Sequence, residues 1–166
     1  IDRIIRVDHD GEYGAKRIYE GNLAVIDDPL IREMKEQELE HLEYFTEQIK
    51  ERQVRPTILM PVWHVGGFML GAISAKLGRK ATMACTVAVE DEIAEHYQKQ
   101  LDELSDEDED GEYADLKEKI TKFRQDEIEH KHHGLENDAE DMKGYKVFYH
   151  LVRGITKTAI ALSERV

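Results

Sequence analysis

The 166-residue chain is poor in residues that cross-link a fold or interrupt helices. Cys85 is its only cysteine, which excludes a disulfide within the chain and a cluster of cysteine ligands, and fits a reducing compartment. Three prolines are present, while long runs rich in Ala, Glu, Lys and Leu follow one another, which favours an all-α fold. This length can bury a substantial core, so we expect one domain over residues 1–166.

Acidic residues are missing from one long stretch. No Asp or Glu occurs in residues 52–89, although the chain has 36 acidic and 23 basic residues and a net charge of −13. That charge argues against general nucleic-acid binding. The acidic excess lies elsewhere, above all in residues 102–115, and basic residues prevail again from Lys143 onward. The distribution predicts one surface suited to anionic lipid and another suited to water.

Periodic runs predict five helices: residues 2–26, 29–52, a run from about 79, 112–133 and 139–164. Pro29 is placed to open the second helix, Gly134 to cap the fourth, and an acidic loop is expected over 106–111. An apolar stripe on the last helix predicts core packing for most of its side chains. The stripe consists of Phe148, Leu151, Val152, Ile155, Ala159 and Leu162.

A further apolar run, residues 57–75, contains His64 as its only ionisable side chain. Its length approaches the roughly 20 residues that span a bilayer. Pro61, His64 and the pair Gly66–Gly67 interrupt it, however. Three arrangements stay open: a transmembrane helix, a buried crossover, and an in-plane hairpin that dips into the membrane. The last two fit the interruptions better and are compatible with each other.

Glutamate and histidine recur in an order typical of a metal site. Glu-x-x-His occurs twice, each copy inside a helix-like run and each preceded, one helix earlier, by a lone glutamate. The six residues are Glu12, Glu38, His41, Glu90, Glu127 and His130. Because residues three apart share a helix face, each motif can direct an oxygen and an imidazole nitrogen at one ion. Together they form the ligand set of a carboxylate-bridged di-iron centre in a four-helix bundle.

The composition allows a less specific interpretation, since 36 acidic residues and eight histidines make a single Glu-x-x-His unremarkable. Two copies with matching upstream glutamates are much less easily accidental. Carboxylate and imidazole suit Fe or Mn, and the lack of thiolates argues against structural zinc. Nearby acids that do not keep the three-residue step to a histidine are expected to be solvated: Glu40, Glu43, Asp91, Glu92 and Glu129.

Each lone glutamate has a tyrosine seven residues later. Glu12 is followed by Tyr19, and Glu90 by Tyr97. Seven residues is about two helical turns, so each tyrosine is expected on the face of its own glutamate. The two halves therefore look like a weak internal duplication about a pseudo-twofold axis.

Several longer stretches carry a specific resemblance: VDHDGEYGAKRIYEGNLAV, QELEHL, VRPTILMPVWHVGGFMLGA, MACTVAVEDEIAEHY, FRQDEIEHKHHGLE and ALSERV. Together they resemble the demethoxyubiquinone hydroxylase family of ubiquinone biosynthesis over nearly the whole chain. The resemblance implies a ferritin-like four-helix bundle with additional amphipathic membrane-associating helices. It also implies an oxidoreductase, a monooxygenase that hydroxylates the ring of demethoxyubiquinol with O2 at two Fe ions.

The resemblance extends to individual residues. By position, the iron ligands fall on the same six residues, and Gln37 and Asp126 are expected to contact the histidine of the opposite helix. His96 and Tyr97 resemble a pair near the iron pocket and are candidates for electron or proton transfer. The acid-free run is the candidate substrate entrance, with Ile58, Leu59, Met60, Trp63 and Phe68 as its side chains.

Expected partners are a polyprenyl quinol, O2, a reductant such as NADH, and a membrane surface, with no nucleic acid. A lipid-presenting partner protein and a homo-oligomer stay open. We expect a peripheral protein on the cytoplasmic face of a bacterial membrane or the matrix face of the mitochondrial inner membrane. No signal or transit pattern is visible, and a start at Ile1 predicts trimming. Alternative functions are a ferroxidase or peroxide-scavenging di-iron protein and a metal-free lipid-binding scaffold.

Overall fold

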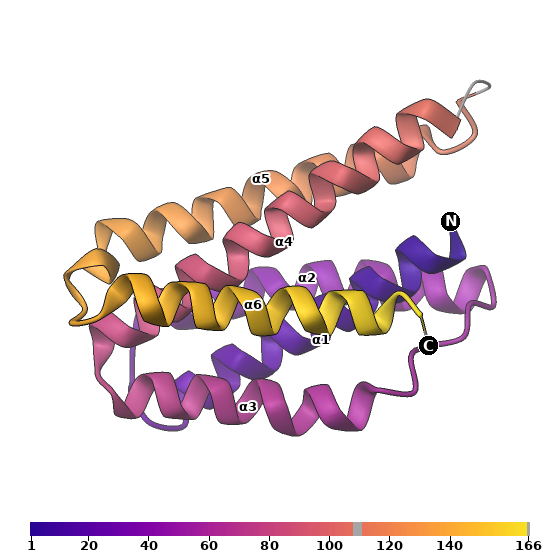
Figure 1. Ribbon diagram of the computed structural model, residues 1–166. Coiled ribbons are helices and arrows are strands. Elements are labelled where there is room, and N and C mark those ends of the chain that lie inside the picture. The colour runs from indigo at the N-terminus through magenta and orange to yellow at the C-terminus, as the bar shows by residue number, and fades with distance from the viewer. Residues whose placement is uncertain (108–110, 166) are drawn as a thin grey trace.

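The computed structural model describes residues 1–107 and 111–165. Within these ranges the chain forms six α-helices, one short 3-10 helix and no strand, which confirms the all-α prediction (Figure 1). The helices are α1 (Asp2–Leu23), α2 (Pro29–Glu51), α3 (Met60–Lys76), α4 (Arg79–Glu107), α5 (Ala114–Glu136) and α6 (Tyr145–Ser163), with the 3-10 helix η1 (Ala139–Asp141) before α6.

Four of these helices make the bundle. The short connections pair α1 with α2 and α4 with α5 as antiparallel neighbours, as is usual in helix bundles. The remaining two lie outside it, α3 along α1 and α6 along α4 (Figure 1). Between the helix pairs, aromatic rings of Phe45, Tyr97 and Phe123 pack in the core. This arrangement is consistent with the ferritin-like bundle expected from the sequence.

Local signals explain where α2 starts. Asp28 is its N-cap and accepts a hydrogen bond from the amide of Leu30 at 3.0 Å, while Pro29 occupies the first turn. The other Asp28 oxygen accepts from Nε of Arg79 at 2.7 Å. The cap of α2 is therefore also a contact to the start of α4.

Three predicted helix boundaries in the second half were wrong. Gly134 does not cap α5, which continues to Glu136; a Cβ there would lie 2.6 Å from Cγ2 of Val87, so this glycine permits close contact with α4. The last helix does not begin at residue 139, because Gly144 (φ +81°) separates η1 from α6. Helix α4 extends into the expected acidic loop as far as Glu107, and residues 108–110 lie outside the described ranges.

The apolar stripe of α6 is only partly in the core. Val152 is buried and Phe148 packs against the core, whereas Leu151, Ile155 and Leu162 are 60%, 48% and 43% exposed. The prediction of core packing for most of the stripe was therefore wrong. The physical reason is that α6 packs mainly on α4 and its outer face is not covered by another described helix.

Residues 60–76 form one helix, so the hairpin prediction was wrong. Pro61 lies in the first turn of α3, where no backbone N–H is needed, and the two adjacent glycines stay helical. Among the described helices, none combines the length and the apolarity required to cross a bilayer. As a crossover, α3 joins α2 to α4 along α1, but its outer face is exposed rather than buried.

A very close crossing holds α3 on α1. A Cβ at Gly71 would lie 1.9 Å from the carbonyl oxygen of Ile18, and one at Gly21 would lie 2.1 Å from that of Phe68. Beside this crossing, the side-chain Nδ2 of Asn22 donates to the Gly71 carbonyl at 2.8 Å and to Oγ of Ser74 at 3.0 Å. The contact is made backbone to backbone, so it depends on the absence of side chains.

The acidic residues that were expected in solvent are not all exposed in the structure. Glu40, Glu43 and Glu129 are exposed, as predicted. Glu92 is buried instead, and its carboxylate accepts from Nε of Arg153 at 2.7 Å. A basic residue on α6 offsets the burial of this charge, which the spacing along α4 does not reveal.

Candidate metal centre

The four bundle helices bring the six predicted ligands together at the middle of the bundle. Glu12 comes from α1, Glu90 from α4, and the two Glu-x-x-His pairs from α2 and α5; each of the six side chains is at most 1% exposed. Their ligand atoms form two groups, each within 4.8 Å: Glu12, Glu38, His41 and Glu127, and Glu38, Glu90, Glu127 and His130. Glu38 and Glu127 belong to both groups.

Both histidines turn Nδ1 toward the carboxylates. Nδ1 of His41 lies 3.1 Å from Oε1 of Glu127 and 3.3 Å from Oε2 of Glu12. Nδ1 of His130 lies 3.1 Å from Oε1 of Glu38 and 3.2 Å from Oε2 of Glu127. Each Nδ1 thus faces two carboxylates, and in each group of ligand atoms the histidine is accompanied by the glutamate of its own motif.

The outer nitrogens of these histidines contact the residues that precede the opposite motif. Nε2 of His41 lies 3.0 Å from Oδ2 of Asp126, and Nε2 of His130 lies 2.5 Å from Oε1 of Gln37. An oxygen acceptor at Nε2 favours the tautomer with its proton there, which leaves the Nδ1 lone pair available for a metal ion.

Several oxygens of the cluster have no hydrogen-bond partner among the described residues, although all are buried. They are Oε2 of Glu12, both oxygens of Glu38, Oε2 of Glu90 and Oε1 of Glu127. Burial raises the pKa of Glu38 and of Glu90, and the neighbouring Glu127 raises both further. Leaving buried carboxylate oxygens unpaired is costly, and divalent cations would offset that cost. The donor set of carboxylate oxygen and imidazole nitrogen fits Fe or Mn.

The imidazoles respond strongly to these carboxylates. Burial lowers the pKa of His41, but its contacts with Glu12 and Glu127 outweigh this effect and raise the pKa to about 12. Conversely, burial raises the pKa of Glu127, but its contacts with His130 and His41 lower it to about 2. A metal ion bound at Nδ1 would replace a proton there, so metal binding should release protons.

Each tyrosine contacts the lone glutamate of the other half of the chain, although it is buried on its helix as its own glutamate is. The Tyr19 hydroxyl donates to Oε1 of Glu90 at 2.6 Å, and that of Tyr97 donates to Oε1 of Glu12. Because α1 and α4 are antiparallel, the residue two turns after one glutamate lies opposite the other. Tyr19 was not among the predicted site residues, and the repeated seven-residue spacing was the signal for it.

His96 makes no hydrogen bond or ion pair with the six candidate ligands. Its Nε2 lies 2.8 Å from the Gln100 amide, which donates to Oδ1 of Asp8 at 2.6 Å. Burial, with the nearby cations Lys99 and Arg3, lowers the pKa of His96 to about 4, so its ring is neutral at pH 7. The role of His96 and Tyr97 in electron or proton transfer stays a prediction.

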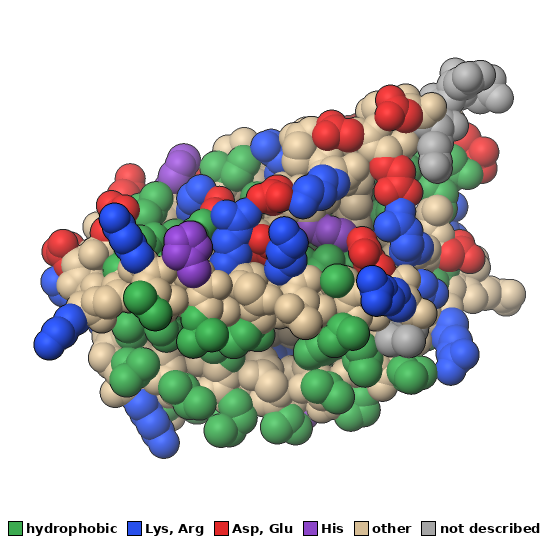
Figure 2. Space-filling view, in the orientation of Figure 1, with side chains coloured by type: hydrophobic (Ala, Val, Ile, Leu, Met, Phe, Trp, Pro, Cys, Tyr) green, Lys and Arg blue, Asp and Glu red, His purple; other side chains and the backbone are tan. Residues whose placement is uncertain are grey.

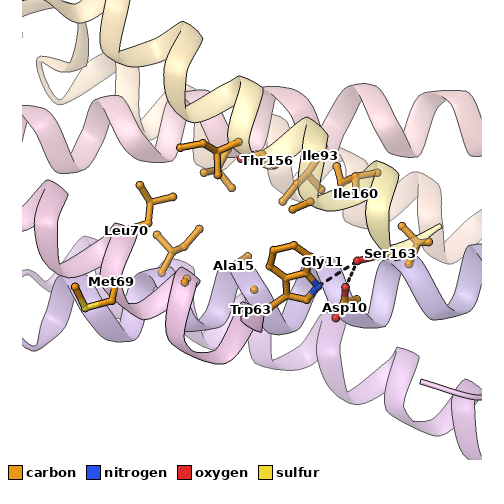
Figure 3. A pocket seen from close by; sticks show the side chains of 18 of the residues that line it. Asp10, Gly11, Ala15, Trp63, Met69, Leu70, Ile93, Thr156, Ile160 and Ser163 are labelled. Atoms are coloured by element: carbon orange, nitrogen blue, oxygen red, sulfur yellow. Dashed lines mark hydrogen bonds between the residues drawn. The ribbon is translucent and has the colours of Figure 1, made fainter. Parts of the chain in front are cut away.

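An apolar pocket of about 340 Å³ lies beside the centre, between α1, α3, α4 and α6 (Figure 3). Gly11 and Val89 line it, and they are the chain neighbours of Glu12 and Glu90. One corner is polar: Nε1 of Trp63 donates to Oγ of Ser163 at 3.1 Å, and Ser163 donates to Oδ2 of Asp10. Exposed Met69, Ile73 and Ile155 also line it, so the pocket opens between α3 and α6.

Of the five side chains predicted for the substrate entrance, only Trp63 lines this pocket. Phe68 lies on the side of α3 that faces α1, where the Arg17 guanidinium sits 4.9 Å from the centre of its ring. Ile58, Leu59 and Met60 precede the pocket or occupy the first turn of α3. The sequence did not show that this run is a regular helix. The helical period of α3 brings Met69, Leu70 and Ile73 to the pocket instead.

Comparison with known proteins gives a consistent result. Residues 1–163 match the family described as "Ubiquinone biosynthesis protein COQ7". The chain is 56% identical to the "NADPH-dependent 3-demethoxyubiquinone 3-hydroxylase, mitochondrial" of Dictyostelium discoideum and 49% identical to that of Homo sapiens. It is 44% identical to the "3-demethoxyubiquinol 3-hydroxylase" of Rhodospirillum rubrum. Each match covers 100% of this chain and 77%, 78% and 78% of the respective relative.

Proposed function

Because the chain belongs to the COQ7 family of ubiquinone biosynthesis proteins, we infer that it is an oxidoreductase that hydroxylates the ring of 3-demethoxyubiquinol with O2. The observation that carries this function is the juxtaposition of two elements. A buried set of four carboxylates and two imidazoles lies directly beside an apolar pocket. Neither element alone would favour a monooxygenase that acts on a lipid.

We propose that the buried cluster holds two Fe ions. Glu38 and Glu127 are the candidate bridging ligands because each belongs to both groups of ligand atoms, while Glu12 and Glu90 are candidate terminal ligands. When bound and reduced, the two ions would supply the electrons and the dioxygen activation that the hydroxylation needs, with one oxygen atom inserted into a ring C–H bond and the other released as water. The hydrogen bond from each tyrosine to a terminal glutamate would limit how far that carboxylate can move.

The pocket supplies what the substrate needs. Apart from its polar corner, its lining is apolar, so it suits a prenylated ring. Ala15 of α1 and Ile93 of α4, which line the pocket, come from the two helices that carry Glu12 and Glu90. We propose that the ring enters from the opening between α3 and α6 and approaches the metal centre between α1 and α4.

Electrons must come from a separate donor. Several relatives are named NADPH-dependent, so we propose a nicotinamide nucleotide as the source of electrons. The sequence left the electron donor open, with NADH as one example, and a comparison of NADH and NADPH in the same assay distinguishes them.

We further propose that the apolar face around the pocket opening binds the membrane that contains the quinol. Figure 2 shows hydrophobic side chains gathered along α3 and the adjoining edge of α6. They include Ile58, Val62, Val65, Met69, Ile73, Leu77, Leu151, Ile155 and Leu162, each at least 43% exposed. Exposed Lys76, Lys80 and Lys146 lie on the same two helices or next to them. This combination fits an anionic bilayer surface.

Charging this face should weaken vesicle binding. We expect Val65→Glu with Leu151→Glu to reduce binding to vesicles containing anionic lipid at least about tenfold, since each side chain loses an apolar contact of about 1.5–3 kcal/mol. Thr121→Glu with Gln125→Glu adds the same charge at exposed positions on α5 and should bind normally. Co-sedimentation measures both. Equal binding by the two variants would contradict membrane contact. The apolar face would then be explained by contact with a second copy of the chain or with another protein.

The direct test of the hydroxylase function is metal analysis followed by a single turnover. The protein is reduced without oxygen, mixed with 3-demethoxyubiquinol and then exposed to O2, and the products are analysed by mass spectrometry. We expect about two irons per chain and a product heavier by one oxygen atom. Two irons with rapid peroxide consumption but no such product would favour a peroxide-scavenging protein. A lack of any bound metal would leave only a lipid-binding scaffold.

A further inference from the structure

The helical glycines fall into two groups. At Gly21, Gly67, Gly71 and Gly134, a Cβ would come within 3.0 Å of an atom of a neighbouring helix, so close packing explains the absence of a side chain. At Gly11, Gly14, Gly66 and Gly154, a Cβ would meet nothing within 4 Å. Glycine destabilises a helix interior relative to alanine, so the second group needs a different explanation.

Three of these four glycines line the apolar pocket. Gly11 and Gly14 are on α1 and Gly66 is on α3, whereas Gly154 lies on an exposed part of α6 and does not line it. The space of the pocket is therefore produced in part by missing side chains. In Figure 3, Gly11 and Ala15 lie on the α1 side of the pocket, across from Ile93 and Ile160.

The glycine surface belongs to the helix that carries the candidate ligand Glu12. Gly11 directly precedes Glu12, and Gly14 lies one turn further along the same side of α1 as Gly11. Bare backbone there leaves a shallow, flat surface rather than a row of aliphatic side chains. A planar ring fits such a surface better than a flexible chain does, because the ring needs width and not length.

A second observation indicates where a polar ring substituent would lie. Asp10, which lines the same pocket, is 3% exposed, and its Oδ1 has no hydrogen-bond partner in the described protein. Its Oδ2 already accepts from Ser163. A buried carboxylate oxygen favours a donor, and a quinol hydroxyl is a donor while a quinone oxygen is not.

We propose that Gly11 and Gly14 form the floor on which the quinol ring lies, and that Oδ1 of Asp10 accepts a hydrogen bond from a ring hydroxyl. These three residues then determine the specificity of the pocket for a reduced, planar head group. The proposal rests on the hydroxylase function inferred above and adds to it the residues that position the ring.

Trp63 provides a readout of pocket occupancy that does not depend on turnover. It is the only tryptophan of the chain and lines the pocket, so a bound quinone should quench its fluorescence. The iron-loaded protein is titrated with a ubiquinone analogue that carries a short alkyl tail, and with its quinol form under anaerobic conditions. Melting temperature and iron content are measured for each variant.

Side chains added at Gly11 and Gly14 should change thermal stability and ligand binding in opposite directions. We expect Gly11→Ala and Gly14→Ala to raise the melting temperature by about 1–4 °C, because alanine favours the helix and no clash is expected. Both should bind the analogue more weakly, and Gly14→Leu should weaken binding at least about tenfold while iron content stays unchanged. Gly154→Ala and Gly154→Leu are the matched controls, since the same exchange in open space outside the pocket should leave binding as in the wild type.

The hydrogen bond is tested by Asp10→Asn. Wild-type protein should bind the quinol more tightly than the quinone, and the variant should lose or reverse this preference, because an amide can donate to a quinone oxygen. If wild-type protein binds neither form, the hydroxylase function itself fails. If wild-type protein binds the quinol but Gly14→Leu binds it equally well, or loses iron and stability as well, the glycine floor is refuted. An unchanged preference in Asp10→Asn refutes the role of Asp10.

Discussion

Glu127→Ala is expected to lose both iron and hydroxylation, because one side chain serves both groups of ligand atoms. Glu127 is fully buried, with its two oxygens 3.1 Å and 3.2 Å from Nδ1 of His41 and of His130. Without it, both proposed ions lose a ligand and the two imidazoles lose their shared carboxylate. We expect bound iron to fall from about two per chain to near zero and turnover to fall at least about a thousandfold. Metal analysis and the quinol hydroxylation assay measure the two effects.

His41→Ala should abolish activity as well, since it removes the only nitrogen of one group. Glu129→Ala is the matched control because Glu129 is two residues from Glu127 in the same helix but exposed. The control should keep both iron and turnover. If Glu127→Ala retained two irons and full activity, Glu127 would have to be removed from the ligand set, and the bridging role with it.

The second large effect is expected at the crossing of α1 and α3. In Gly71→Ala, the new Cβ would lie 1.9 Å from the carbonyl oxygen of Ile18 and 3.0 Å from the amide nitrogen of Asn22. Both are backbone atoms that cannot rotate away, so the helices must separate. We expect a loss of about 2–4 kcal/mol in the free energy of unfolding, and a melting temperature lower by about 5–15 °C.

Circular dichroism during heating measures this change. Gly154→Ala is again the control, because it makes the same exchange at a helical glycine with nothing within 4 Å. That variant should be as stable as the wild type or slightly more stable. A Gly71→Ala protein that melts within a degree of the wild type would show that α3 can shift without cost, and that this crossing does not fix the position of the pocket.

The sequence by itself determined the features that depend on neighbours along one helix. A Glu-x-x-His step places its two side chains on one face whatever the helix packs against, so both ligand pairs were recognisable before the fold was known. The start of α2 at Pro29 and the all-α class depend on equally local signals. The structure gathers all six residues in the core, while their binding of iron remains a prediction.

Only the tertiary structure decided the features that depend on what lies opposite. Gly11 and Gly71 are both glycines inside helices. A side chain at Gly11 would enter the open space of the pocket, whereas a side chain at Gly71 would clash with the backbone of α1. Tyr19 and Tyr97 contact the glutamates of the other half because α1 and α4 are antiparallel, which spacing within one helix cannot reveal. The stripe on α6 is half exposed because no described helix covers it. Side-chain spacing is a property of one helix, whereas pockets, crossings and exposed faces are properties of pairs of helices.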